Sequence, residues 1–182
     1  MFKRTNVIKL IAAASLFGFF GSAAMAQTQN GSLGATSTGQ IDLDLEVTDS
    51  VEITAVGSID LGSYGGGDVG GINKGDAFCV YVNGGDGYTI TPTSLNGEFA
   101  LLGTAGGDKI EYSVKLVGAA TGAASATAQT YNSKTSTFTG SRLRNCGSAD
   151  NASVDISIAE QEIRDASTDT YADTLILLVN PV

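Results

Sequence analysis

QIDLDLEVT, at residues 40–48, is the stretch that decides the fold, because it alternates strictly between apolar and acidic side chains. Successive side chains of a β-strand point to opposite faces, so this alternation predicts a strand with one apolar face and one acidic face. The apolar face holds Ile41, Leu43, Leu45 and Val47, and the acidic face holds Asp42, Asp44 and Glu46. The sharpest structural signal in the sequence is therefore that of a strand.

Further short strands are predicted at regular intervals after this stretch. Each is bounded by Gly or Asp, and they cover residues 51–55, 58–63, 77–83, 88–93, 98–102, 109–116 and 154–158. We also expect an exposed Ala/Gly-rich loop over 118–128, a ragged strand or hairpin within 129–146, and one helical turn over 160–165. Short strands separated by turns predict an antiparallel, immunoglobulin-like β-sandwich.

The last segment, residues 171–179, is apolar on both faces. Its apolar residues are Leu175, Ile176, Leu177, Leu178 and Val179. A run of this kind predicts a central strand that is buried on both sides. Because the sequence stops directly afterwards, an apolar groove beside this strand would need a partner from outside the domain to avoid aggregation.

The first 26 residues have the three parts of a secretory signal: basic residues, an apolar run over 10–20, and a small-residue site at 24–26. We expect cleavage between Ala26 and Gln27. A transmembrane anchor is the alternative, but a bilayer core requires about 20 apolar residues and this run is shorter. The predicted organisation is a signal peptide (1–26), a flexible leader (27–38), an N-terminal strand (39–48) and a sandwich domain (49–182).

Export would leave a single acidic domain. The signal holds three of the 10 basic side chains and no acidic ones, so 19 acidic and 7 basic side chains remain, a net charge of −12. Nucleic acid and anionic membrane surfaces would repel such a chain. Cys79 and Cys146 are the two cysteines, and an exported chain with two cysteines predicts one disulfide between them.

The sequence does not favour catalysis, a cofactor or a metal. It has no His, and Asp42 and Asp44 lie on the polar face of a strand, where solvated carboxylates are common. The Gly-rich stretch 63–71 lacks the Lys-Ser/Thr of a P-loop. Asp residues at 68, 76 and 86 each lie near Gly, but their spacing matches no calcium loop, so turns explain them.

Five stretches together resemble the archaic chaperone-usher pilins and the related spore coat protein U-like domains. In chain order they are TGQIDLDLEVTDS, VGSIDLGSY, FCVYVNGGDGYTITP, EYSVKLVGAATG and DTYADTLILLVNPV. The chain departs from this family in its cysteines, because its first-strand region, VEITA, contains none.

The resemblance implies an incomplete sandwich that lacks its final strand. A periplasmic chaperone would fill the groove first, an outer-membrane usher would export the subunit, and the N-terminal strand of a neighbouring copy would then replace the chaperone. Ile41, Leu43, Leu45 and Val47 would be the inserted side chains, and residues 175–179 would line the groove. The product would be a surface fibre that supports adhesion and biofilm formation.

Two alternatives are also compatible with these residues. Residues 40–48 could be an ordinary edge strand of their own domain, because alternation alone does not distinguish self-pairing from donation. The whole protein could also be a secreted spore-coat-like or carbohydrate-binding sandwich that forms no fibre.

Overall fold

The computed structural model describes residues 30–85 and 87–182 and divides the chain into two units, residues 1–46 and 47–182. The expected signal peptide, its cleavage point after Ala26, and residues 27–29 of the leader lie outside the described residues. Residues 41–49 form neither helix nor strand, although their alternation predicted a strand. A β-strand requires a neighbouring strand for its backbone N–H and C=O groups, and no described strand pairs with residues 41–49.

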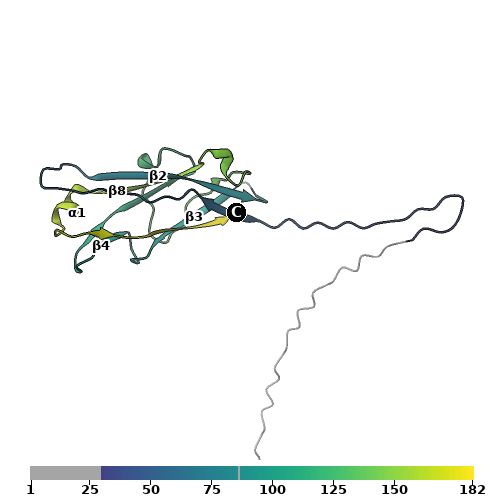
Figure 1. The fold of residues 1–182 in the computed structure, drawn as a ribbon, viewed down its shortest axis with the longest axis horizontal. Helices are drawn as coiled ribbons and strands as arrows, with labels where there is room; N and C mark the ends of the chain where they lie inside the picture. The colour runs from purple at the N-terminus through teal and green to yellow at the C-terminus, as the bar shows by residue number, and fades with distance from the viewer. Residues whose placement is uncertain (1–29, 86) are drawn as a thin grey trace, which may run out of the picture. The chain divides into compact units, whose positions relative to one another are not determined.

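The unit of residues 47–182 is an antiparallel, immunoglobulin-like β-sandwich (Figure 1). One sheet has the order β1-β2-β8-β6, a second has β10-β3-β7, and a small third sheet has β5-β4-β9. The strands are β1 (Ser50–Thr54), β2 (Ile72–Asn83), β3 (Gly87–Ser94), β4 (Ala100–Gly103), β5 (Lys109–Glu111), β6 (Ser113–Val117), β7 (Phe138–Thr139), β8 (Ala152–Ile158), β9 (Tyr171–Ala172) and β10 (Leu175–Pro181). One α-helical turn, α1 (Glu160–Asp165), follows β8 as expected.

The core lies between the sheets, and its large apolar side chains recur with a period of two along the longer strands. Phe78, Val80 and Val82 alternate along β2 and are fully buried, as are Tyr88 and Ile90 of β3. The inward residues of β6 and β8 complete this cluster. Burying each large apolar side chain stabilises the fold by about 1.5–3 kcal/mol, which explains why these alternating segments form strands with one face in the core.

Two of the predicted strands differ from expectation. The stretch 109–116 is divided at Tyr112 into β5 and β6, which belong to different sheets, although its alternate residues are buried as predicted. Residues 58–63 form no strand. Ala55 has φ of +61°, a left-handed conformation that is unfavourable for a residue with a Cβ, and the pairing of β1 with β2 ends just before it, at Thr54.

The terminal segment corrects the sequence analysis. The prediction of a central strand over 171–179 is wrong, because β10 is the outer strand of its sheet and pairs with β3 alone among the described strands. Its two faces also differ: Leu175 and Leu177 pack against the core, whereas Ile176 and Leu178 are 42% and 56% exposed. An apolar run shows that a strand has two apolar faces, but not whether a second sheet covers both of them.

A disulfide joins Cys79 of β2 to Cys146 of the short 3-10 helix η2 (Cys146–Ser148), as the cysteine count predicted. The same loop is held to β2 by Asn151, whose side chain accepts from Val80 N at 2.8 Å and donates to Val80 O at 2.9 Å. Most of 129–146 is irregular apart from β7, and the expected loop 118–128 contains a further 3-10 turn, η1 (Ala123–Ser125), with Ala123 buried.

Candidate docking groove

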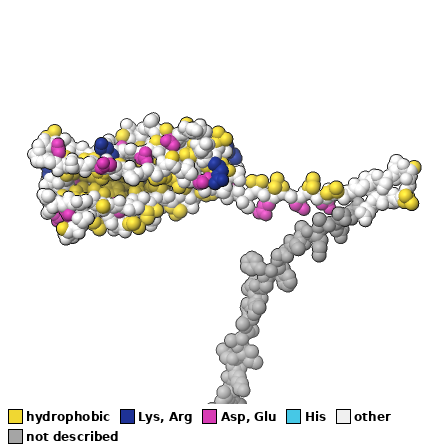
Figure 2. All heavy atoms as spheres, in the orientation of Figure 1, with side chains coloured by type: hydrophobic (Ala, Val, Ile, Leu, Met, Phe, Trp, Pro, Cys, Tyr) yellow, Lys and Arg dark blue, Asp and Glu magenta, His cyan; other side chains and the backbone are white. Residues whose placement is uncertain are grey.

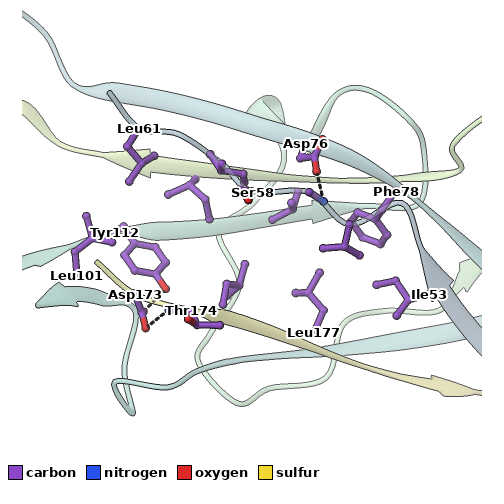
Figure 3. Close-up of a pocket in the computed structure, with 16 residues that line it drawn as sticks. Ile53, Ser58, Leu61, Asp76, Phe78, Leu101, Tyr112, Asp173, Thr174 and Leu177 are labelled. Atoms are coloured by element: carbon purple, nitrogen blue, oxygen red, sulfur yellow. Dashed lines mark hydrogen bonds between the residues drawn. The ribbon is translucent and has the colours of Figure 1, made fainter. Parts of the chain in front are cut away.

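An apolar groove of about 520 Å³ opens between β10 and the chain that follows β1 (Figure 3). Its floor is formed by core side chains, among them Phe78, Val154 and Ile156. The lining residues are Ile53, Val56, Gly57, Ser58, Ile59, Leu61, Asp76, Phe78, Leu101, Tyr112, Val154, Ile156, Asp173, Thr174, Leu175 and Leu177. Figure 2 shows hydrophobic surface gathered along the middle of this face of the unit. A sandwich normally covers such surface with a strand.

One wall of the groove is the segment 55–62, which has left the first sheet. It begins at the left-handed Ala55 and ends at Gly62, whose φ of +84° favours glycine. Gly57 N donates to Asp76 Oδ2 of β2 at 2.9 Å, but no strand ladder joins this segment to β2 in the described chain. Backbone groups of this wall therefore remain available for an added strand.

The other wall is β10, together with the two residues that precede it. Asp173 Oδ2 accepts from Tyr112 Oη and from Ser94 Oγ, both at 2.6 Å, and Asp173 Oδ1 accepts from Thr174 N at 2.7 Å. These bonds hold the chain where it passes from β9 to β10, and they place Tyr112 and Asp173 at one end of the groove (Figure 3). Burial, with the hydrogen bond to Asp173, raises the pKa of Tyr112, so its hydroxyl keeps its proton.

The two ends of the groove differ: one lies beside the turn between β2 and β3, and the other lies beside Asp173. Ser50 pairs with Asn83 and Pro181 pairs with Tyr88, so the start of β1 and the end of β10 both lie beside the turn between β2 and β3. Asp173 lies at the opposite end of β10. The segment that precedes the sandwich and the C-terminal residues therefore leave from the same end of this unit.

The N-terminal segment carries an apolar face that its own chain leaves in solvent. Leu43 and Leu45 are each 90% exposed, Ile41 is 79% exposed and Val47 is 64% exposed. Figure 2 shows hydrophobic side chains along one side of this segment and acidic side chains along the other. A contiguous exposed apolar row of this kind is unusual in a soluble chain and marks an interaction surface.

The five residues expected to line a groove, 175–179, lie at different places along β10. Leu175 and Leu177 line the groove, Val179 packs on the core further along β10, and Ile176 and Leu178 face the opposite side. Tyr112, Asp173 and the 55–62 wall were not predicted from the sequence as parts of a groove. A signal for Asp173 was present in the sequence, because it is the one acidic residue within the predicted strand 171–179.

The described residues contain no group of three or more potential metal-ligating side chains. No helix in the described part of the chain is long and apolar enough to cross a membrane. No protein-family model and no curated protein matches the sequence.

Among solved structures, a chain from a chaperone-tip adhesin complex, described as vital for synergistic activation of CFA/I fimbriae biogenesis, resembles this protein. The sequences are 14% identical and the TM-score is 0.47. The match covers 72% of this chain and 42% of the other, so the present chain spans less than half of that protein's length.

Proposed function

We propose that the protein is a structural subunit of an extracellular chaperone-usher fibre, in which residues 39–48 of one copy fill the groove of the next. The fibre would support surface adhesion and biofilm formation. The partners would be a periplasmic chaperone that occupies the groove during transit, an outer-membrane usher, and other copies of this chain or of related subunits. The route would run through the periplasm to the cell surface.

One observation carries this proposal: the chain has both an open apolar groove and a separate exposed strand-like segment of matching chemistry. Three intervals of about 6.6 Å separate the side chains from Ile41 to Val47 in an extended strand. Their combined burial is worth on the order of 6–12 kcal/mol before the entropy of association is subtracted. Backbone hydrogen bonds to β10 and to the 55–62 wall would add affinity, as in other cases of strand addition.

The geometry of the sandwich unit favours an open chain of subunits over a closed pair. A donated strand antiparallel to β10 brings Val47 to the Asp173 end of the receiving groove, opposite the end from which the receiver's own segment leaves. Each receiver then has its own donor free for the next subunit. Heterologous contacts that do not close generate filaments.

We call residues 39–48 the donor segment. The test of the proposal is to place a charge on the apolar face of this segment. Leu43→Asp and Leu45→Asp should abolish SDS-resistant polymers and fibres visible by electron microscopy, because a carboxylate would be buried without a partner. The amount of the chain in the periplasm should stay within about twofold of wild type, since the substituted side chains lie outside the sandwich core.

Asp44→Asn is the matched control, because it changes the acidic face of the same segment and should leave fibres intact. Normal polymers from Leu45→Asp would refute the proposal. Loss of the folded chain before any assembly would show that residues 39–48 are an edge strand of their own domain.

A further inference from the structure

The groove is apolar along most of its lining but contains two carboxylates. Asp76 lies on the inward face of β2, two residues before Phe78. Asp173 lies on the wall formed by β10 and the two residues that precede it (Figure 3). In the described chain neither is paired with Lys or Arg, and the donors that the structure gives them are backbone N–H groups and hydroxyls. An inserted strand would remove water from both, which strengthens their interaction with any charge on that strand.

The donor segment has a matching feature on its other face. Asp42, Asp44 and Glu46 alternate with the apolar residues, so a register slip of one residue would exchange the two faces completely. Backbone hydrogen bonds alone do not prevent this slip, because they are the same for either face. The slipped strand would place three carboxylates in a groove that already holds two.

We propose that Asp76 and Asp173 are specificity-determining residues that exclude strands with acidic inward side chains. This inference rests on the proposed function and adds to it the chemistry of the accepted strand: its inward face is neutral or basic, and acids are restricted to its outward face. Desolvation disfavours any charge in the groove, whereas like-charge repulsion disfavours acids alone. The sign of the charge therefore separates the two effects.

The experiment measures binding of synthetic peptides of residues 37–49 to the full chain carrying Leu43→Asp, which disables its own donor segment. The peptides have the native sequence or Lys, Gln or Glu at position 45, with a second set at position 47, the position nearest the Asp173 end. We expect the native peptide to bind most tightly and Lys to bind at least about tenfold more tightly than Glu at one or both positions. Fluorescence polarisation at low salt gives the dissociation constants.

Substitution of the groove carboxylates then tests the cause. Asp76→Asn keeps an oxygen that can accept from Gly57 N, and Asp173→Asn keeps one that can accept from Tyr112. Each should reduce the Lys-to-Glu affinity ratio by about threefold or more, and the double variant should bring it close to one. Asp150→Asn is the control, because Asp150 is exposed and outside the groove lining, so the same change in net charge there should leave the ratio unaltered.

The outcomes distinguish this inference from the proposed function. If the native peptide fails to bind, the proposed function and the inference both fail. If it binds but Lys and Glu peptides bind equally, the inference alone is overturned. A Lys preference that survives in the double variant, or that Asp150→Asn removes equally, also overturns it, because the preference would then arise from the net charge of the chain.

Discussion

Two buried tyrosines have opposite hydrogen-bonding situations, and removing each hydroxyl should have opposite consequences. Tyr112 Oη donates to Asp173 Oδ2 at 2.6 Å, whereas Tyr88 Oη is buried and has no hydrogen-bond partner among the described residues. Tyr112→Phe and Tyr88→Phe delete the same single atom from side chains that are 8% and 0% exposed. The pair therefore compares a satisfied hydroxyl with an unsatisfied one at nearly constant burial.

The expected magnitudes follow from these contacts. A hydrogen bond to a charged group contributes about 1.5–3 kcal/mol, and Asp173 would keep two further donors, so Tyr112→Phe should cost about 1.5 kcal/mol. An unsatisfied buried hydroxyl carries a desolvation cost of about 1–3 kcal/mol, so Tyr88→Phe should be neutral or stabilise the fold by up to about 1 kcal/mol. A difference of about 2 kcal/mol between the variants corresponds to roughly 8 °C in Tm for a unit of this size.

The assay is urea unfolding of the full chain with its disulfide intact, at one protein concentration, followed by circular dichroism. Equal m-values would show that both variants unfold from equally compact states. If Tyr88→Phe destabilises the chain as much as Tyr112→Phe does, the hydroxyl of Tyr88 has a partner that the structure does not show. The reasoning about Asp173 would be refuted if Tyr112→Phe were neutral.

Two further predictions concern the cross-link and alkaline pH. The Cys79–Cys146 disulfide has a sequence separation of 67, so replacing both cysteines with Ala should lower the free energy of unfolding by about 4 kcal/mol in the chain-entropy model. Chemical denaturation measures this free energy. A loss under about 1 kcal/mol would contradict the chain-entropy explanation. Burial raises the pKa of Tyr88 from 10.0 to about 12, so the unfolded chain loses this proton first and stability should fall as pH rises from about 10 to about 12. Tyr88→Phe should flatten that part of the pH profile, and an unchanged slope would argue against the shift.

Part of the groove could be anticipated from the residues themselves. The alternation in 40–48 identifies the four apolar side chains of the proposed donor, and the apolar run 175–179 indicates the strand that forms one wall, because both are local patterns in the sequence. The position of β10 could not be anticipated, since an apolar residue such as Leu178 looks the same in sequence whether a second layer covers it or solvent does. Only strand order decides that.

By itself, then, the sequence determined the properties that local periodicity and composition control: an all-β domain, one possible disulfide between Cys79 and Cys146, and an amphipathic segment ahead of the domain. The tertiary structure alone decided where strands end and what they leave uncovered. It divides 109–117 at Tyr112, turns the chain out of the first sheet at Ala55, and brings Asp76 and Asp173 into one groove from positions 97 residues apart. The physical reason is that a groove is made by contacts between distant segments, and such contacts depend on how sheets pack rather than on the order of residues within any one strand.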